Sequence, residues 1–339
     1  MHRYRLASAA CATIIALVAP NSVAAEPLNI KLAWSTIPGH FAPLIPTTPK
    51  YAPELYRHYG KSYLVEPVKL RGGGANLTAL AAGEINVDNA TPPSLVLGTT
   101  EAKLDLRVIA QEISTEVPGY LYTYFWVRAK DVSKIEDLKG KIIAIPGRGG
   151  NPDAAAQMIM AQHGLKLPED YQITEIPFSA MIPALQSKRI DAGILVPPFN
   201  VIAEKDPALK PLFSVHDAFG AVETVFWMAK ADFVAQNRPA LVDFLEDNIK
   251  MRRWIFDQVT RMDAIKQVSD ITKIPVQQYS DWIYSTKDYY YQPDALIDVQ
   301  RLQNNVDVMA KLGVVPARID VTPLVDLSLA KEAASRIKD

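Results

Sequence analysis

Cysteine is nearly absent from this chain, which has a single one, Cys11, among its 339 residues. An internal disulfide and a metal site built from several cysteines are therefore excluded. Histidine is also scarce, and the spacing of the five present matches no metal-binding motif: His2, His40, His58, His163 and His216. The Gly-x-Ser-x-Gly sequence of serine hydrolases is missing too. These absences predict a protein that is not an enzyme, with no catalytic residues, no metal and no cofactor.

A surplus of one charge sign is lacking as well, because 36 Lys and Arg face 37 Asp and Glu, for a formal net charge of −1. No stretch clusters basic residues on one face, so we expect no nucleic-acid partner. After the N-terminal segment, no apolar run reaches the roughly 20 residues that a membrane-spanning helix needs. The hydrophobic content of 49% is typical of a soluble globular protein.

The first 25 residues have the pattern of a signal peptide. A basic start is followed by an apolar stretch from Leu6 to Ala19, and small residues at 23–25 precede Glu26. A membrane anchor is the alternative, but the apolar stretch is short and is interrupted by Pro20. We therefore expect a signal peptide over 1–25, cleaved after Ala25, and a periplasmic protein.

Cys11 raises a second possibility at the N-terminus. The residues before it resemble a poor lipid-attachment sequence, which would tether the mature chain to the membrane. The apolar region continues past Cys11 to Ala19, which favours ordinary cleavage after Ala25. Cleavage there leaves a mature chain without cysteine.

An internal repeat indicates the fold. Residues 77–94 and 182–199 can be aligned so that each predicts a short helix, a turn, a buried strand and a double proline. The identical pairs are Ala79/Ala184, Leu80/Leu185, Ile85/Ile190, Pro92/Pro197 and Pro93/Pro198. Strands are predicted upstream of the two windows at 65–70 and 173–176, and again at 29–33 and 141–145. Each unit is then a parallel βαβ crossover, and the chain is expected to be an α/β protein with two similar lobes.

The connections between the lobes follow from two further predicted strands. The segment 120–127 enters the second lobe after Val117-Pro118-Gly119, and a strand at 224–229 returns to the first. We therefore expect lobe 1 to comprise 26–117 and 222–339, lobe 2 to comprise 118–221, and two strands to form a hinge. Apolar spacing predicts helices over 239–260 and 275–311, packed on lobe 1 as a C-terminal cap.

Ligands of open α/β sheets bind beyond the carboxyl ends of the strands, so the loops at these ends supply the candidate site. From lobe 1 we expect Trp34, Ser35, Thr36, His40, Gly73, Gly74, Asn76, Asn89 and Thr91 to contact a ligand. From lobe 2 we expect Arg148, Gly149, Gly150, Asn151, Pro197 and Phe199, with Phe178 and Ser179 as weaker candidates.

The loop 147–151 has the chemistry of an anion site. Asn151 is a good helix N-cap, Pro152 suits the first helical position, and free backbone N–H groups there, with Arg148, would attract an anion. In the alternative interpretation, Asn151 and Asp153 only cap the helix and Arg148 is solvated. The run Gly72-Gly73-Gly74 would supply a second set of backbone donors or be a flexible turn, and it matches neither a P-loop nor a dinucleotide fingerprint.

Aromatic residues at two strand ends predict a ligand with an apolar or planar body. Trp34 and Phe199 could enclose it, although both residue types are more often part of the core. His40 either touches the ligand or is structural. Residues 289–291, three tyrosines in the C-terminal cap, are expected to pack there or to lie on the surface rather than to contact the ligand.

The segment Leu138–Gly147, LKGKIIAIPG, resembles the strand-to-site signature of the nitrate, sulfonate and taurine class of ABC substrate-binding proteins, the NMT1-like family. Residues 77–87, LTALAAGEINV, and residues 184–192 are similar to its other repeated segments, and the resemblance extends over 26–330. It implies a monomeric, two-lobed periplasmic binding protein of type II that delivers its ligand to an ABC permease in the inner membrane.

The resemblance leaves the ligand open among sulfonates, nitrate, carboxylates and pyrimidines. The pyrimidine-precursor members have a cysteine-rich motif that this chain lacks. The glycine loops and Arg148 favour an anion, and Trp34 and Phe199 favour a body larger than nitrate. We therefore expect an alkyl or aromatic sulfonate or carboxylate, taurine-like in size. The alternatives are an enzyme of pyrimidine synthesis with the same fold and a periplasmic ligand sensor for a signalling receptor.

Overall fold

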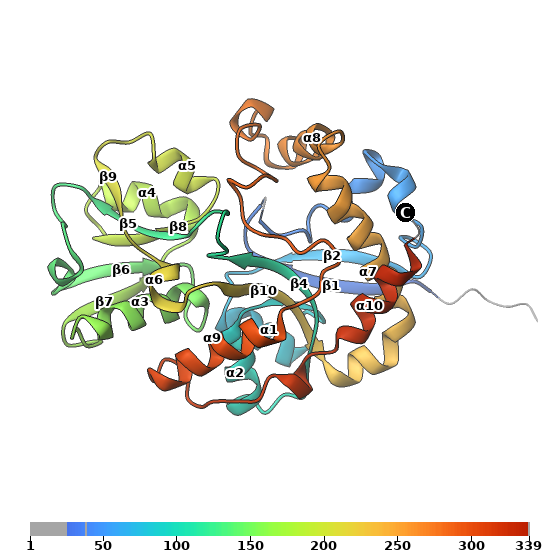
Figure 1. Cartoon of the computed structure of the whole chain (residues 1–339), viewed down its shortest axis with the longest axis horizontal. Coiled ribbons are helices and arrows are strands. Elements are labelled where there is room, and N and C mark those ends of the chain that lie inside the picture. Colours follow the sequence, from blue (N-terminus) through green and yellow to red (C-terminus); the bar gives the residue numbers. More distant parts are fainter. Residues whose placement is uncertain (1–25, 38, 338–339) are drawn as a thin grey trace, which may run out of the picture.

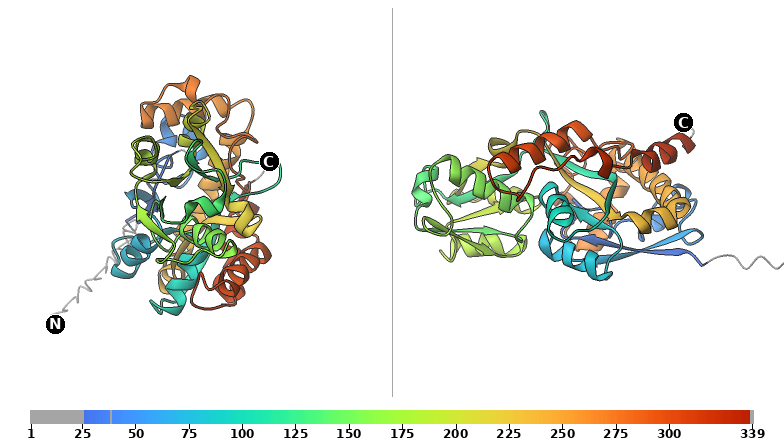
Figure 2. Two further views of the ribbon diagram at one scale, coloured as in Figure 1. Left: turned by 90° about the vertical axis from the view of Figure 1, so that its left-hand side faces the viewer. Right: turned by 90° about the horizontal axis from the view of Figure 1, so that it is seen from below.

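The structure is a computed structural model that describes residues 26–37 and 39–337. The predicted signal peptide, 1–25, and Cys11 lie outside the described residues. Figure 1 shows a green and yellow lobe beside a larger one coloured blue, teal, orange and red, with extended segments between them. The right-hand view of Figure 2 separates the same two parts. Within the described ranges, no helix is both long and apolar enough to cross a membrane.

The larger lobe, lobe 1, is built on strands from both ends of the chain: β1 (Leu28–Trp34), β2 (Tyr63–Lys69), β3 (Asp88–Ala90), β4 (Leu106–Thr115) and β10 (Val222–Lys230). β1 pairs with β2 in parallel, and a parallel bridge between Leu32 and Val87 joins β1 to the segment that leads into β3. β10 then pairs antiparallel with both β3 and β4. The strand order of lobe 1 is therefore β2-β1-β3-β10-β4.

Lobe 2 contains β5 (Tyr124–Arg128), β6 (Lys141–Ile145), β7 (Tyr171–Glu175), β8 (Ala192–Leu195) and β9 (Leu209–Ser214), in the order β7-β6-β8-β5-β9. β6 is parallel to β7 and β8, and β5 is antiparallel to β8 and β9. This is the order of lobe 1, with β5 in the place of β10. The prediction of an α/β fold with two similar lobes is confirmed.

Helices cover both faces of each sheet. They are α1 (Gly74–Ala82), α2 (Pro92–Thr100), α3 (Asn151–Gln162), α4 (Phe178–Gln186), α5 (Phe199–Ala203), α6 (Val215–Phe219), α7 (Ala231–Phe256), α8 (Arg261–Thr272), α9 (Val299–Lys311) and α10 (Leu327–Arg336). In lobe 2, α3 and α4 lie on opposite sides of the strands (Figure 1). The ends of the parallel strands are thereby left open to form a site.

The alternation of residues along β10 explains how the core of lobe 1 is divided. Phe226 and Met228 belong to one apolar cluster, which includes residues of α2 and α9. Trp227 and Ala229 point the other way, into a second cluster with residues of α7 and α10. Successive side chains of a strand face opposite sides, so a strand buried on both faces has an unbroken apolar sequence. The first cluster also continues into lobe 2.

The C-terminal helices differ from the prediction in two places. Helix α7 runs from Ala231 to Phe256, but a non-helical residue, Asn237, divides it into two segments. The second segment contains Pro239 near its start, as predicted, and ends at Phe256 rather than at Thr260. The predicted helix over 275–311 is wrong before Val299, where turns replace it. The reason is tertiary: buried Asp288 accepts hydrogen bonds from the backbone N–H groups of Tyr284 and Tyr289, at 2.9 and 2.8 Å, which helical geometry would not allow.

The chain crosses between the lobes at residues 116–123 and 215–221, and the two crossings are tied together. The Glu116 carboxylate accepts hydrogen bonds from the backbone N–H groups of Thr123, at 2.9 Å, and His216, at 3.2 Å. The ring of Tyr122 stacks on that of His216 with centroids 4.6 Å apart. Burial raises the pKa of Glu116 to about 7. The hinge is therefore an organised unit rather than two independent linkers.

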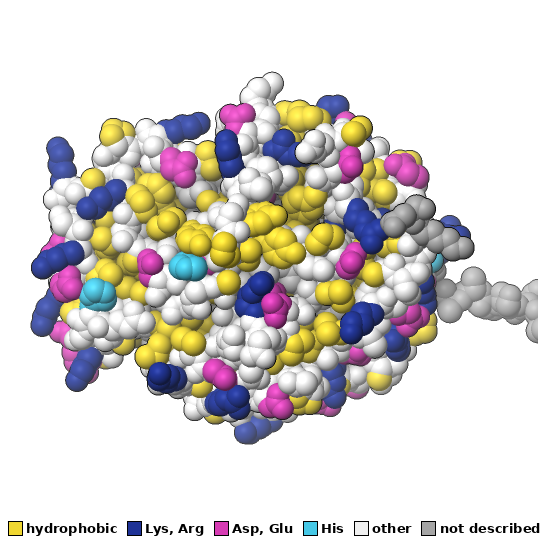
Figure 3. Space-filling view, viewed as in Figure 1, with side chains coloured by type: hydrophobic (Ala, Val, Ile, Leu, Met, Phe, Trp, Pro, Cys, Tyr) yellow, Lys and Arg dark blue, Asp and Glu magenta, His cyan; other side chains and the backbone are white. Residues whose placement is uncertain are grey.

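The surface shows no strong segregation of charge on the face seen in Figure 3, where basic and acidic side chains are interspersed around the rim. Hydrophobic side chains gather in a band across the middle of that face.

Candidate ligand-binding site

The two glycine-containing loops touch each other. The backbone N–H of Gly74 donates a hydrogen bond to the carbonyl oxygen of Arg148, with nitrogen and oxygen 3.0 Å apart. A Cβ atom on Gly73 would lie 2.3 Å from the same oxygen, and Gly73 has a φ of +56°. Only glycine permits this approach. The structure therefore shows the lobes in contact, with the cleft between them closed at this edge.

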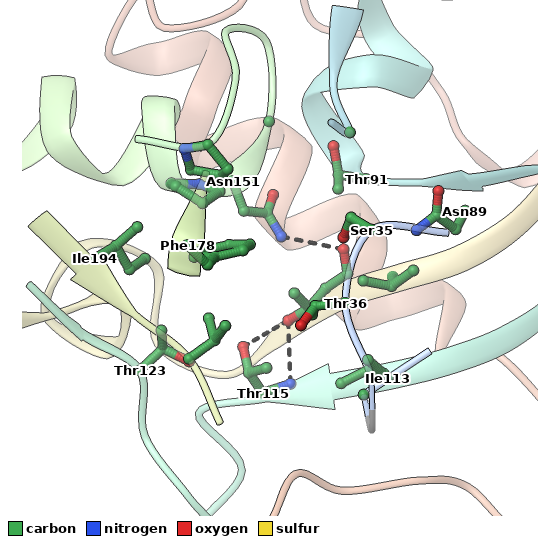
Figure 4. A pocket seen from close by; sticks show the side chains of 18 of the residues that line it. Ser35, Thr36, Asn89, Thr91, Ile113, Thr115, Thr123, Asn151, Phe178 and Ile194 are labelled. Carbon is green, nitrogen blue, oxygen red and sulfur yellow. Dashed lines mark hydrogen bonds between the residues drawn. The ribbon is translucent and has the colours of Figure 1, made fainter. Parts of the chain in front are cut away.

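Beside this contact lies a cavity with about 120 Å³ of space open to water, formed by both lobes and the hinge. Figure 4 shows Phe178 projecting into it between Ile194 and Asn151 on one side and Ser35 and Thr36 on the other. Lobe 1 contributes Ser35, Thr36, Gly39, His40, Arg71, Gly72, Gly73, Asn89, Thr91, Ile113, Thr115, Thr224, Val225 and Tyr289. Lobe 2 and the hinge contribute Thr123, Pro146, Gly147, Gly150, Asn151, Pro152, Phe178, Ile194, Val196, Pro197 and Val215.

One wall is a chain of buried polar groups. The side chain of Asn89 bonds to Nδ1 of His40, and its oxygen accepts a hydrogen bond of 2.5 Å from Asn76. Asn76 also donates to Asp88, at 2.8 Å, and accepts from the backbone N–H of Gly72, at 3.0 Å. Burial lowers the pKa of His40 to about 4 and raises the pKa of Asp88 to about 7. His40 is thus neutral at neutral pH, and Asn76 supports the wall from behind.

The opposite wall has hydroxyl and amide groups near the hinge. The hydroxyls of Thr115 and Thr224 bond to each other at 2.5 Å, and the Asn151 side-chain nitrogen donates to the Thr224 carbonyl oxygen at 3.2 Å. The Asn151 side-chain oxygen is buried and bonds to no group of the described chain. Gly150 is the N-cap of α3 and Asn151 the first helical residue, so the helix begins one position earlier than predicted. Asn151 is thereby free to reach β10 instead of capping its own helix.

The structure gives Arg148 a partner within its own loop. Its guanidinium donates to Asp153 at 3.0 Å, and the second Asp153 oxygen accepts from the backbone N–H of Gly149 at 2.9 Å. The Arg148 side chain is 42% exposed and does not line the cavity. The start of α3 therefore already faces a carboxylate of the protein itself. The hydrogen bond from Gly149 to Asp153 agrees with one part of the alternative interpretation, in which Asp153 serves the start of the helix. The rest of that interpretation differs from the structure, because Asn151 does not cap the helix and Arg148 is paired with Asp153.

A different cation, Arg71, lines the cavity. It follows β2 and precedes the glycine run, so the rule that ligands bind at the carboxyl ends of strands could have identified it. Its side chain is exposed, and within the described ranges no acidic side chain pairs with it. Arg71 also lines an outer groove that adjoins the cavity, so it lies at the boundary of the two spaces.

The outer groove, of about 1010 Å³, contains the predicted aromatic residues Trp34 and Phe199. The Lys69 ammonium lies 5.1 Å from the centroid of the Trp34 ring. Phe178 lines both spaces, and Ser179 lines the groove. Of the described residues that line the cavity or the groove, none is an aspartate or a glutamate.

The predicted site residues therefore fall into three groups. Those on the cavity wall are Ser35, Thr36, His40, Gly73, Asn89, Thr91, Gly150, Asn151 and Pro197. Trp34 and Phe199 line the outer groove with Ser35 and Thr36. Gly74, Asn76, Arg148 and Gly149 line neither space, and the first three make hydrogen bonds that hold the walls together.

The structure also brings together three potential metal ligands that the sequence did not suggest. His58 lies close to Asp243 and Glu246 of α7, and one possible ligand atom of each lies within 4.8 Å of the others. Both carboxylates already have cationic partners, Arg336 at 2.9 Å from Asp243 and Lys250 at 2.6 Å from Glu246. The group is far better explained as an ion-pair network than as a metal site.

The fold is shared with several solved structures. The alkanesulfonate-binding protein SsuA from Xanthomonas axonopodis pv. citri, bound to MOPS, is 16% identical with a TM-score of 0.69, and the match covers 90% of this chain and 100% of that one. The periplasmic nitrate-binding protein NrtA from Synechocystis PCC 6803 is 17% identical with a TM-score of 0.70, covering 92% and 90%. A Candida albicans protein described as having the generic periplasmic binding protein fold is 13% identical with a TM-score of 0.64, covering 93% and 96%.

These likenesses, together with a cavity enclosed by two lobes, define the chain as a protein of the two-lobed periplasmic binding protein fold. Residues 24–269 match the model of the NMT1-like family, and the chain belongs to this family. No curated protein sequence matches the chain.

Proposed function

We propose that the protein is the solute receptor of an ABC importer and binds a small organic anion in the interlobe cavity. The ligand is an alkyl or aromatic sulfonate or carboxylate, with taurine among the candidates. The receptor acts as a monomer in the periplasm after cleavage at Ala25 and passes its ligand to a permease in the inner membrane. Lobe 1 comprises 26–117 and 222–339, lobe 2 comprises 118–221, and the protein catalyses no reaction.

The observation that supports an anion is the positive charge at the mouth of the cavity. Arg71 lies at the boundary of the two spaces without an acidic partner in the described chain, and Lys69 lines the groove beside it. No acidic side chain in the described walls balances these cations. An unbalanced guanidinium forms strong charge-assisted hydrogen bonds to a carboxylate or sulfonate, so the site selects negative ligands.

The similar structures support the same class of ligand. Two of them are, by name, an alkanesulfonate-binding and a nitrate-binding protein. The family match is consistent with a receptor role, and the closed contact between Gly74 and Arg148 is what a receptor that encloses its ligand requires.

A thermal-shift screen of the purified protein against organic sulfonates, carboxylates, taurine and nitrate tests the proposal. A ligand at 100 times its dissociation constant that binds only the folded protein stabilises it by roughly 2.7 kcal/mol, which is an easily measured shift. If a neutral or cationic solute shifts the transition and no anion does, the proposal is wrong. Mass spectrometry of the mature N-terminus separately tests export, since an uncleaved chain would contradict a periplasmic receptor.

A further inference from the structure

The inner cavity is electrically neutral apart from its rim. Among the described residues that line it, the ionisable ones are His40, Arg71 and Tyr289. Burial lowers the pKa of His40 to about 4 and raises that of Tyr289, so both are uncharged at neutral pH. An anionic group placed deep in this cavity would lose its hydration without gaining a counter-charge, which is costly. The negative group of a ligand therefore belongs at the rim, next to Arg71.

The helix starts around the cavity offer no better place for the charge. α3 already faces the Asp153 carboxylate, and α2 begins with Pro92 and Pro93, whose nitrogens carry no hydrogen. At α1, the N–H of Gly74 is bonded to Arg148. The start of α4 differs, because its second residue, Ser179, lines the same outer groove as Arg71.

The size and walls of the cavity fit one ring. Its volume of about 120 Å³ is close to that of an engineered protein cavity of roughly 150 Å³ that accepts benzene. Apolar side chains face it from both lobes, Ile113 and Val225 from lobe 1 and Ile194 and Phe178 from lobe 2. Figure 4 shows Phe178 extending toward the side chains of lobe 1. Such walls favour a flat, apolar body over a hydrated inorganic ion.

A buried acceptor adds one requirement. The Asn151 side-chain oxygen has no partner in the described chain, and the residue is only 2% exposed. Buried acceptors are normally satisfied, and leaving one unpaired is unfavourable. A hydroxyl or N–H donor on the ligand body would pair with it.

We infer that the ligand is a monoacid with a single-ring body that bears a hydroxyl or amino group, oriented with the ring in the inner cavity and the carboxylate or sulfonate at the rim on Arg71. This inference rests on the proposed function, since it assumes that the cavity binds an organic anion. It assigns to Arg71 the recognition of the acid group, to Phe178 that of the ring, and to Asn151 that of the polar substituent.

Titration calorimetry on the purified protein with matched solutes tests the inference. Hydroxybenzoates, aminobenzoates, benzoate and benzenesulfonate are compared with acetate, taurine and nitrate, and with neutral benzamide. We expect the ring acids to bind at least about tenfold more tightly than the small anions and than benzamide, which keeps the ring and loses the charge. If taurine, acetate or nitrate binds most tightly, the inference is wrong and the proposed function stands. If benzamide or a cationic solute binds most tightly, the inference and the proposed function are both wrong. If no ring acid binds, the inference is wrong.

A pair of arginine variants tests the orientation. Arg71→Gln should weaken binding of the tightest ring acid about tenfold to a hundredfold and leave benzamide binding unchanged, because only the charged contact is lost. Arg189→Gln is the matched control, since Arg189 is an exposed arginine of lobe 2 that lines neither space, and it should keep the affinity of the wild type. Equal losses in Arg71→Gln and Arg189→Gln, or an unchanged affinity in Arg71→Gln, would overturn the assignment of Arg71.

Discussion

Gly74 of lobe 1 donates its backbone N–H to the carbonyl oxygen of Arg148 in lobe 2, and this 3.0 Å hydrogen bond closes one edge of the cavity. The bond forms only because the neighbouring Gly73 has no Cβ atom to collide with that oxygen. The closed arrangement of the two lobes therefore depends on a contact between backbones, whereas the cavity wall beside it consists mostly of side chains.

A single methyl group at Gly73 should prevent closure. In Gly73→Ala the new Cβ would lie 2.3 Å from the Arg148 oxygen and 3.2 Å from the Gly150 nitrogen, so the lobes would have to separate. Because ligand is held by contacts present only in the closed state, we expect affinity to fall about tenfold or more. Calorimetry would measure the affinity, and small-angle scattering would show whether ligand still reduces the radius of gyration.

Gly83→Ala is the control for backbone strain. Gly83 also has a positive φ, +77°, but a Cβ there would meet no atom within 4 Å. Gly83→Ala should lower the melting temperature by a small amount, since alanine in the left-handed conformation of Gly83 costs roughly 1 kcal/mol. Gly73→Ala should lower it more, because Gly73, with φ +56° and ψ −131°, has a conformation that is essentially restricted to glycine. If Gly83→Ala weakens ligand binding as much as Gly73→Ala, steric closure is not the cause.

Removal of the Asn151 side chain should affect binding more than folding. Asn151→Ala deletes the bond to the Thr224 oxygen and the free acceptor, each with a net value of about 1 kcal/mol, so we expect a loss of affinity of roughly fivefold to thirtyfold for hydroxyl-bearing ligands. Ligands without a donor should lose less. Asn200→Ala is a suitable comparison, because Asn200 is also buried in lobe 2 with an unpartnered oxygen but does not line the cavity.

Truncation of Phe178 should separate ligand contact from stability. Phe178 is only partly buried in the structure and lines both the cavity and the groove. We expect Phe178→Ala to cost about 1 kcal/mol or less in the free energy of unfolding, and to reduce affinity for a ring ligand about tenfold through lost ring contact. Denaturant unfolding and calorimetry on one preparation would compare the two effects. A large loss of stability with unchanged affinity would place Phe178 in the core instead.

The buried His40 predicts a specific pH response. Its pKa is about 4 in the folded protein and 6.5 in the unfolded chain, so between these values only the unfolded chain binds the proton. Acidification from pH 6.5 toward pH 4 should therefore disfavour folding through His40, whereas Asp88, with its pKa raised from 3.8 to about 7, acts in the opposite direction.

His40→Gln isolates the contribution of the histidine. The change in melting temperature from pH 7 to pH 5 should be less unfavourable in this variant than in the wild type. Nuclear magnetic resonance offers a direct check, because the imidazole signals of His40 should stay constant from pH 8 to pH 5. A titration of His40 near pH 6.5 would show that the ring is hydrated rather than buried.

The sequence predicted the two lobes because the repeated pattern of apolar strands and double prolines is local. The rule that ligands bind beyond the carboxyl ends of strands likewise identified Ser35, Asn89 and Asn151 as cavity-lining residues, because the topology brings these strand ends together. The role of Arg148 was harder to predict, because its partner Asp153 is set by the exact start of α3. The same rule applies to Arg71, which follows β2, although the sequence alone does not distinguish an arginine that faces the cavity from one that faces only solvent. The turns before α9 depend on the buried Asp288, a tertiary effect that periodicity does not reveal.

The order of the strands also has a consequence for how the chain folds. Lobe 2 takes all of its strands, β5 to β9, from one continuous stretch of sequence, so it can complete its sheet alone. Lobe 1 needs β10 between β3 and β4, and β10 follows lobe 2 in the chain. Until residues 222–230 arrive, β3 and β4 present open edges that could pair with other chains. The lobe that begins the sequence is therefore the one that is finished last.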